Sequence, residues 1–385
     1  MRHFSSLLPC YFTFVPMHPL LIATLFLILG IGWQSWLQHS WFIIGTVILM
    51  LITALSLYTQ KTRYLFFFTT FVLGGLLYTK QHTDHNKIFL SFANKPLACI
   101  ATVISEEKRS DNSRIKQMLI IQIEKIYPHT PKPGHWYTAN AYIQMYLAQP
   151  TNAVPGDTLA ITGISIKKAP NESFERYLIK EGFAASICLP QLHAILLSRP
   201  QLNIRRTLWA LKTDLLYRIK EKLSSKTFAL FSSIFLGNKQ MVKKEMNTIK
   251  DYYKTWGISH HLARSGLHLV IFIALWGLLL NLLALPFMLK QLTLLFICFL
   301  YFLLSWTSIS FMRAFFTFIL YKTCTFSKIS SNTVHILSIV TFITLICNPS
   351  QLFFLDFQLS FGLTGALAWF NLILQTQKRV LGQNC

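Results

Sequence analysis

A cluster of ionisable and polar side chains stands at the mouth of an apolar run, in the stretch GISHHLARSGLHLVIF at residues 257–272. Its members are His260, His261, Arg264, Ser265 and His268. Such groups are costly at membrane depth, where they usually face a bundle interior or a water-filled cavity. Three roles fit these residue types: they could line a water-filled path, they could bind a metal ion, or the serine could act as a nucleophile.

A helix over this stretch would gather the five polar side chains on one face. At about 100° per residue, they fall within an arc of about 140° that begins at His260. Gly266 lies on the opposite side, where a neighbouring helix can approach closely. The arc therefore predicts a channel-lining stripe, and a stripe that merely packs and caps the helix is the structural alternative.

A metal site fits the stretch poorly. His261 and His268 would lie about 10 Å apart along the helix axis, whereas a Zn–N bond is about 2 Å long. No Cys or carboxylate is close in sequence, and no GxxxxGK[ST] nucleotide loop occurs in the chain. We expect no metal and no cofactor.

The enzyme alternative is an intramembrane hydrolase in which Ser265 is the nucleophile and His268 its base. The spacing of these two side chains is set by the helix itself. No Asp or Glu lies close in sequence to orient the imidazole. We therefore expect that the protein is not an enzyme.

Two other stretches carry polar groups inside apolar sequence. Arg313, in SISFMRAFFTFIL, must pair, snorkel or face water, and we expect it on the same path as the arc. Asp356, Gln358 and Ser360 lie in FFLDFQLSFG. The amide of Gln358 suits contacts within a helix bundle, and Asp356 is a candidate partner for Arg313.

The composition indicates an integral membrane protein. Of 385 residues, 53% are hydrophobic and only 13% are charged, whereas soluble domains carry about 25% charged residues. The net charge of +22 suits cytoplasmic loops, anionic lipid or a polyanionic cargo, without choosing among them. The seven cysteines form no CxxC or Cys/His cluster of the zinc type.

The apolar pattern of residues 1–80 predicts about three transmembrane helices. We expect the first of them to be retained and not cleaved as a signal peptide. These segments are Leu20–Trp36, Trp41–Tyr58 and Tyr64–Tyr78. Arg2 precedes the first segment and TQKTR follows the second, whereas the loop between them has no Lys or Arg. The positive-inside rule then places the N-terminus in the cytoplasm and the chain after Lys80 outside it.

Residues 87–197 predict a soluble β domain inserted between membrane segments. Runs such as NAYIQMYL and DTLAITGISI are rich in β-branched and aromatic residues and are separated by Pro, Gly, Asn and Asp. This is the pattern of short strands in a small barrel or sandwich. Cys99 and Cys188 lie near its two ends. Outside the cytoplasm they could form a disulfide, and two buried free thiols are the alternative.

Residues 200–225 predict an amphipathic helix, lying either on the membrane surface or on the helix bundle. Its apolar positions are Ile204, Leu208, Leu211, Leu215, Ile219 and Leu223. Residues 226–385 return to apolar segments, several of them short or interrupted by polar residues, as in broken or re-entrant helices. The expected fold is a polytopic α-helical membrane protein with an inserted soluble β domain.

Four stretches, in this order along the chain, resemble the ComEC-type competence proteins. KKAPNESFERYLIKEGFAASICL resembles the end of that family's N-terminal soluble domain, and GISHHLARSGLHL resembles its first membrane signature. Arg313-Ala314 resembles its arginine-containing helix, and NPSQLFFLDFQLSFG its second signature. Each motif alone is modest, but four in the right order are specific and cover nearly the whole chain.

The resemblance implies a component of the inner-membrane channel that takes up single-stranded DNA during natural transformation. It implies an OB-like barrel for the soluble domain, which could present basic and aromatic residues to the DNA. Lys108, Arg109, Arg114 and Lys116 flank one hairpin-like turn of this domain, and an ordinary solvated loop is the alternative for this cluster. Implied partners are membrane lipid, further copies of the chain, a DNA receptor and a cytoplasmic ATP-driven motor. A DNA path needs positive and hydrogen-bonding groups. The candidates for this path are His260, His261, Arg264, Ser265, His268 and Arg313, with Gly266, Gln358, Ser360 and Asp356 as bundle contacts.

The chain departs from the family pattern in three places. His261 and Arg264 stand where the family usually has apolar residues, and Asp356 stands where Gly is common. Family members often continue into a metallo-β-lactamase-like domain, but no HxHxDH cluster occurs before Cys385. We expect a truncated, split or degenerate member without nuclease activity. A small-solute transporter and a non-functional remnant are the alternatives.

Overall fold

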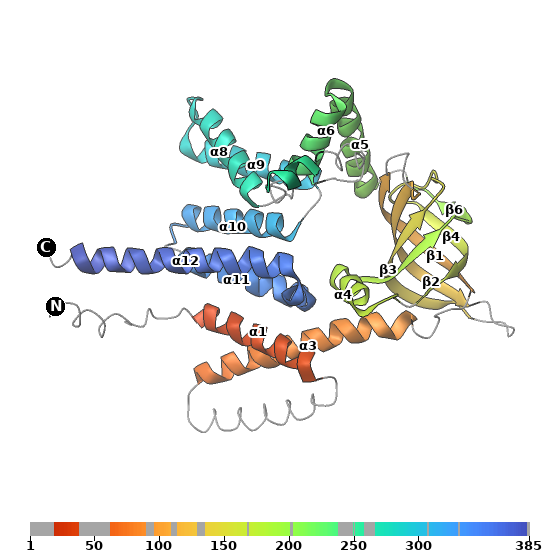
Figure 1. Ribbon diagram of the computed structural model, residues 1–385, viewed down its shortest axis with the longest axis horizontal. Coiled ribbons are helices and arrows are strands. Elements are labelled where there is room, and N and C mark those ends of the chain that lie inside the picture. Colours follow the sequence, from red (N-terminus) through yellow and green to blue (C-terminus); the bar gives the residue numbers. More distant parts are fainter. Residues whose placement is uncertain are drawn as a thin grey trace. The chain divides into compact units, whose positions relative to one another are not determined.

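The computed structural model (Figure 1) consists of two compact units, residues 1–80 with 320–385 and residues 81–319. The structure describes residues 19–37, 62–89, 96–108, 114–128, 135–167, 169–200, 203–237, 249, 251–257, 266–305, 308–329 and 332–382.

A six-stranded sheet forms the β part of the second unit. Its strands are β1 (Pro96–Lys108), β2 (Gln117–Pro128), β3 (Tyr137–Leu147), β4 (Thr158–Ser165), β5 (Phe183–Leu189) and β6 (Ala194–Ser198). Every second residue of the central strands is buried, such as Ala101 and Val103 on β1 and Ile121 and Ile123 on β2. This alternation follows from the two-residue period of a strand and places one apolar core on the inner face of the sheet.

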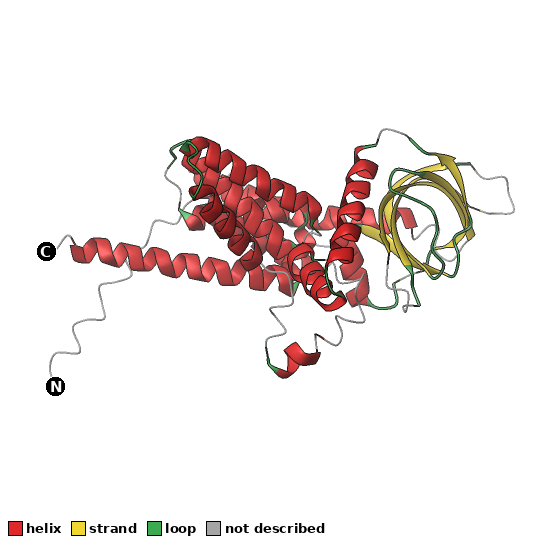
Figure 2. Cartoon of the chain, turned by 90° about the horizontal axis from the view of Figure 1, so that it is seen from above, coloured by secondary structure: helices red, strands yellow, loops and turns green. Residues whose placement is uncertain are grey.

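The sheet is open, with the strand order β5-β3-β2-β1-β4-β6. β3 and β5 pair in parallel and the other neighbours are antiparallel. Figure 2 shows that the sheet curls strongly around its core. The closed barrel that the resemblance implies is not observed, because β5 pairs only with β3 and β6 only with β4 among the described strands. The β part is thus a curled open sheet.

The helix α4 (Glu172–Glu181) makes the crossover that a parallel β3–β5 pair requires. The Asn171 side chain caps its first turn by accepting a hydrogen bond from the Phe174 amide at 2.8 Å. Gly182 ends the helix at φ +73°, a left-handed conformation that glycine adopts without steric cost. These two caps set where the chain leaves α4 to enter β5.

An ion pair joins the turn before β4 to the segment that leads out of the sheet. The Asp157 carboxylate is fully buried and accepts two hydrogen bonds from the Arg199 guanidinium, at 2.6 and 2.9 Å. This carboxylate also raises the pKa of Arg199, through the hydrogen bonds and its charge. A β-carbon on Gly156 would stand 2.7 Å from the Asn203 side-chain nitrogen. The start of the next helix is therefore held close to this turn.

The possible disulfide between Cys99 and Cys188 is not formed in this structure, in which both thiols are free. Cys99 is buried on β1, whereas Cys188 is exposed on β5, with β2 and β3 between these strands in the sheet order. Neighbouring strands lie about 4.8 Å apart, and a disulfide needs Cα atoms within about 7 Å. Only Cys99 fits the alternative of buried thiols.

The helical part of the second unit begins with the predicted amphipathic helix. Its elements are α5 (Ile204–Lys222), α6 (Ser225–Phe231), the π-helix η2 (Ser232–Leu236), α8 (Gly266–Asn281), α9 (Phe287–Leu304) and α10 (Ile309–Phe326). The second half of α5 packs on this bundle, with Leu216 buried against Phe228 and Leu236. The first half does not: Ile204 is 80% exposed and Leu211 is 60% exposed. The apolar stripe of α5 is thus covered by protein along only half its length.

The first unit contains α1 (Pro19–Leu37), the start of α3 (Thr62–Phe89), α11 (Thr333–Cys347), the 3-10 helix η4 (Pro349–Phe353) and α12 (Leu355–Gly382). Glycines let α1 and α3 approach backbone to backbone. A β-carbon on Gly30 would overlap the Phe71 carbonyl, and one on Gly74 would stand 2.5 Å from the Leu27 carbonyl oxygen. Close packing over small residues is characteristic of membrane helices.

Among the described residues, three helices are long and apolar enough to cross a membrane, at Pro19–Trp36, Phe287–Leu304 and Leu355–Gln375. Three shorter apolar helices accompany them, at Ser225–Leu236, Gly266–Asn281 and Thr333–Cys347. The predicted segment Trp41–Tyr58 lies outside the described residues. The composition and these helices together indicate a membrane protein.

Candidate functional site

The polar arc meets the described structure only at its C-terminal end. His260, His261, Arg264 and Ser265 lie outside the described residues, and α8 begins at Gly266. The helical arc over these four side chains therefore stays a prediction. His268, the fifth member, lies in the first turn of α8 and is half-buried.

Gly266 is a point of close contact between α8 and α10. It is buried, and a β-carbon there would stand 3.0 Å from the Ala314 Cβ and 3.3 Å from the Ser310 carbonyl oxygen. Most real Cβ contacts are wider than these distances. The missing side chain of Gly266 thus lets α10 approach the end of the polar motif.

Arg313 lies at this same contact. Its Nη2 atom is 3.5 Å from the β-carbon position of Gly266, and the side chain is half-buried on α10. Gly266 directly follows Ser265, so the fold carries the guanidinium to the end of the histidine-rich motif. Gly266 and Arg313, which are 47 positions apart in the sequence (313 minus 266), thus lie close together in the fold.

An aromatic cluster behind this contact holds α8, α9 and α10 together. The Phe272 ring stacks on the Tyr301 ring at a centroid distance of 4.2 Å, and Tyr301 meets Phe311 edge-on at 5.5 Å. Phe302 stacks on Phe315 at 4.4 Å. The Tyr301 hydroxyl donates a hydrogen bond of 2.7 Å to the Phe235 carbonyl of η2. The ring of Tyr301 is thus packed and its hydroxyl is hydrogen-bonded, as is usual for a buried tyrosine. This packing positions α8 and α10, the helices that carry Gly266 and Arg313.

The second signature lies in the first unit, at the junction of η4 and α12. Phe357 and Phe361 are buried and stack at 4.5 Å. Gln358 donates a hydrogen bond of 2.9 Å to the Leu352 carbonyl, which ties the start of α12 to η4. Asp356 is exposed in the first turn of α12, where a negative charge interacts favourably with the helix dipole.

Ser360 is the polar side chain of this signature that faces inward. Its hydroxyl oxygen is buried and has no hydrogen-bond partner within the described part of the chain. A buried hydroxyl without a partner is costly.

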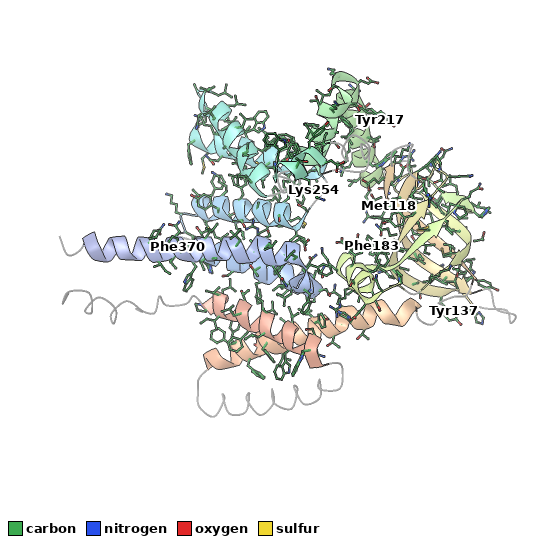
Figure 3. The ribbon with its side chains drawn as sticks, in the orientation of Figure 1. Met118, Tyr137, Phe183, Tyr217, Lys254 and Phe370 are labelled. Atoms are coloured by element: carbon green, nitrogen blue, oxygen red, sulfur yellow. The ribbon has the colours of Figure 1, made fainter. Side chains whose placement is uncertain are left out.

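The β part carries an aromatic surface that the sequence reasoning missed. Tyr127 is the penultimate residue of β2 and Trp136 directly precedes β3, and the centroids of their rings lie 5.4 Å apart. Trp136 and Tyr137 are each half exposed, and Figure 3 labels Tyr137 in the β part. Two aromatic residues flanking one loop, in YPHTPKPGHWY, are the sequence signal that would have found this pair. Exposed aromatic rings offer stacking faces for bases.

The predicted basic cluster lies at a different loop. Lys108 ends β1, and Arg114 and Lys116 precede β2, all three with exposed side chains. Arg109 lies outside the described residues. Among the described side chains, no group of three His, Cys, Asp or Glu could hold a metal ion.

Comparison with known proteins identifies one domain. Residues 234–385 match the family model described as Competence protein. The matched range includes the polar arc, Arg313 and the second signature, and it agrees with the resemblance to the ComEC-type proteins. No curated protein and no solved structure matches the chain.

Proposed function

From the Competence protein domain that this chain carries at residues 234–385, we propose that it is a component of the inner-membrane channel for uptake of single-stranded DNA. The family match is the observation that carries the proposal, and it supports a role in competence. The finer assignment to the channel rests on the arrangement of polar groups at the start of α8.

The contact between Gly266 and Arg313 supports a DNA path at this place. Single-stranded DNA brings one negative charge per nucleotide, so its path needs positive groups and hydrogen-bond donors that tolerate any sequence. Arg313 brings a guanidinium to the end of a motif that already contains Arg264 and three histidines. In our proposal the DNA backbone passes these groups.

The curled β sheet would stand outside the cytoplasm and guide the strand. The rings of Tyr127 and Trp136 offer stacking faces, and the exposed side chains of Lys125 and His135 lie next to them in sequence. In our proposal the protein transports DNA without catalysis. A DNA receptor would supply the strand and a cytoplasmic ATP-driven motor would pull it.

Natural transformation in a strain that lacks this gene tests the proposal. We expect the deletion to abolish transformation and the wild-type gene to restore it. The Arg313→Ala gene should not restore transformation, even when the variant protein is expressed at the wild-type level. The matched control is Arg176→Ala, because it removes the same side chain from an exposed i,i+4 pair on α4. Normal transformation in the deletion strain would contradict the proposal and favour a solute transporter or a remnant.

DNA binding by the purified chain tests the aromatic surface separately. Each base–aromatic stack contributes about 1–3 kcal/mol to single-strand binding, so Trp136→Ala should weaken binding about 5- to 150-fold. Trp256→Ala is the control, since Trp256 is also exposed, at 78%, but belongs to the helical part. Equal effects of the two substitutions on DNA binding would show that the aromatic surface of the β part does not bind the DNA strand.

A further inference from the structure

An apolar pocket of about 410 Å³ lies beside the amphipathic helix α5. Its walls come from α5, α6, η2, α8 and α9, and include Leu215, Phe235, Trp276 and Leu300. This volume is in the range of small-molecule sites, which are mostly apolar with few polar groups. The lining contains one charged side chain, Lys212 of α5. The pocket is separate from the contact between Gly266 and Arg313, which these lining residues do not include.

One wall of the pocket belongs to a candidate membrane span. Ile297, Leu300 and Leu304 of α9 line the pocket, and α9 is apolar over its whole length. Leu300 is 42% exposed, so the pocket continues into the outer surface of this helix. In a bilayer that surface contacts acyl chains, and the pocket is apolar enough to admit one.

The opposite wall is a helix with the pattern of a membrane-surface segment. The uncovered stripe of α5 runs from Ile204 through Leu208 and Leu211 to Leu215, which also lines the pocket. Basic residues flank this stripe, namely Arg205, Lys212, Lys220 and Lys222. Arg218 is paired with Asp214 at 2.9 Å. Amphipathic helices with basic flanks lie at the membrane interface and favour anionic lipids.

We propose that this pocket is a binding site for an anionic phospholipid of the surrounding membrane. One acyl chain lies between α5 and the α8–α9 pair, and the phosphate is bound by the basic residues that flank the stripe of α5. Phe272 and Tyr301 line the pocket and also belong to the aromatic cluster behind Gly266. The bound lipid therefore stabilises the packing of the helices that carry Gly266 and Arg313. The proposal does not depend on DNA uptake, since lipid binding is measured without DNA.

Photolabelling of the purified full-length chain in phosphatidylcholine nanodiscs tests this site. A trace phospholipid carries a diazirine midway along one acyl chain, with either a phosphatidylglycerol or a phosphatidylcholine headgroup. We expect labelled peptides from α5 and the second half of α9. Since each Lys near an anionic surface changes binding about fivefold, the phosphatidylglycerol probe should label at least about five times more strongly.

Two bulky substitutions test the acyl-chain position. Leu215→Trp and Leu300→Trp each place a larger ring in the pocket, and both positions are partly exposed, so the helices tolerate the added volume. Both should reduce labelling several-fold. Leu208→Trp is the control, because Leu208 is exposed to a similar degree on the same helix but does not line the pocket.

The headgroup is tested by charge removal. Lys212→Gln with Lys220→Gln should erase most of the preference for phosphatidylglycerol, whereas Lys125→Gln with Lys167→Gln, in the β part, should leave it intact. Equal labelling by the two wild-type probes overturns the proposal, as does full labelling of both tryptophan variants. Chain-to-chain cross-links from Leu215→Cys without lipid labelling would assign the pocket to a second copy and overturn it equally.

Discussion

The Arg313 guanidinium reaches Gly266 because residue 266 has no side chain. Its Nη2 atom lies 3.5 Å from the point that a β-carbon would occupy, and the Ala314 methyl lies 3.0 Å from that point. A single missing methyl group thus lets the arginine of α10 meet the end of the histidine-rich motif.

Gly266→Ala should lower both the melting temperature and transformation, because the added methyl group overpacks a contact with Ala314. Overpacking of this kind costs about 1–3 kcal/mol. Adding Ala314→Gly removes the opposing methyl group and should restore much of the loss. Thermal unfolding of the four proteins in detergent measures the coupling of the two sites.

The control for this cycle is Gly277→Ala on the same helix, where a β-carbon would meet nothing within 4 Å. Alanine is a better helix former than glycine by about 1 kcal/mol, so this variant should be as stable as the wild type or more so. A double variant no better than Gly266→Ala alone would show that Ala314 is not the limiting contact.

Gly30→Ala should destabilise the α1–α3 pair. The new methyl group would overlap the Phe71 carbonyl, and a backbone atom cannot move away as a flexible side chain can. We expect a lower yield of folded protein and a lower melting temperature in detergent. Gly32→Ala, two residues away with open space around it, should show neither effect. Equal stability of the two variants would contradict the close approach of these helices.

Glu106 should make the β part less stable as the pH rises. Burial raises the pKa of its carboxyl above the ordinary value of 4.5, more than the hydrogen bond from Gln117 and the charge of Lys108 lower it. Since the folded pKa is above the unfolded one, its contribution is complete below pH 4.5 and declines as pH rises through the folded pKa.

Glu106→Gln keeps an acceptor for the 2.7 Å hydrogen bond from Gln117 and cannot ionise. The melting temperature of this variant should therefore exceed that of the wild type by more at neutral pH than at about pH 4, where the carboxyl is protonated in both the folded and the unfolded chain. Glu124→Gln, on the exposed face of β2, serves as the comparison. Parallel melting curves of wild type and Glu106→Gln across this range would exclude ionisation of Glu106 as the cause.

Cys188 should react with maleimide in the native protein, whereas Cys99 should react only after unfolding. Cys188 is exposed, and burial raises the pKa of the Cys99 thiol to about 12, so almost no thiolate forms at neutral pH. Variants that keep one cysteine each are labelled before and after denaturation and compared by mass. Native labelling of Cys99 would contradict its place in the core.

The same Cys188 variant reports orientation when a membrane-impermeant maleimide is added to intact spheroplasts. Labelling from outside agrees with the predicted topology, in which the chain after Lys80 lies outside the cytoplasm. Labelling only after lysis would reverse that topology.

The sequence predicted the elements whose residues repeat with a fixed period. The alternation of β1 to β4 and the apolar spacing of α5 were enough to place strands and an amphipathic helix, because each period follows from backbone geometry alone. The Arg313 interruption was also visible, since a charge in an apolar helix requires a physical explanation.

The sequence did not predict which segments meet. The contact of Gly266 with Ala314 and the separation of Cys99 from Cys188 depend on strand order and helix packing, which no local pattern encodes. One half of the apolar stripe of α5 is covered by the bundle and the other half is exposed. This division depends on where Phe228 and Leu236 pack against α5. The Tyr127–Trp136 pair was missed because its two rings meet only when the loop between β2 and β3 brings its two ends together.

The parallel pairing of β3 with β5 also bears on the order in which the chain can fold. β3 ends at Leu147, but its parallel neighbour is complete only at Leu189, after β4 and α4 have been made. During synthesis and membrane insertion, β3 therefore offers an unsatisfied edge for as long as the intervening segment takes to emerge. Such edges invite pairing with other chains, and non-local pairings form late. A pause in synthesis within residues 148–182 would therefore prolong the exposure of this edge.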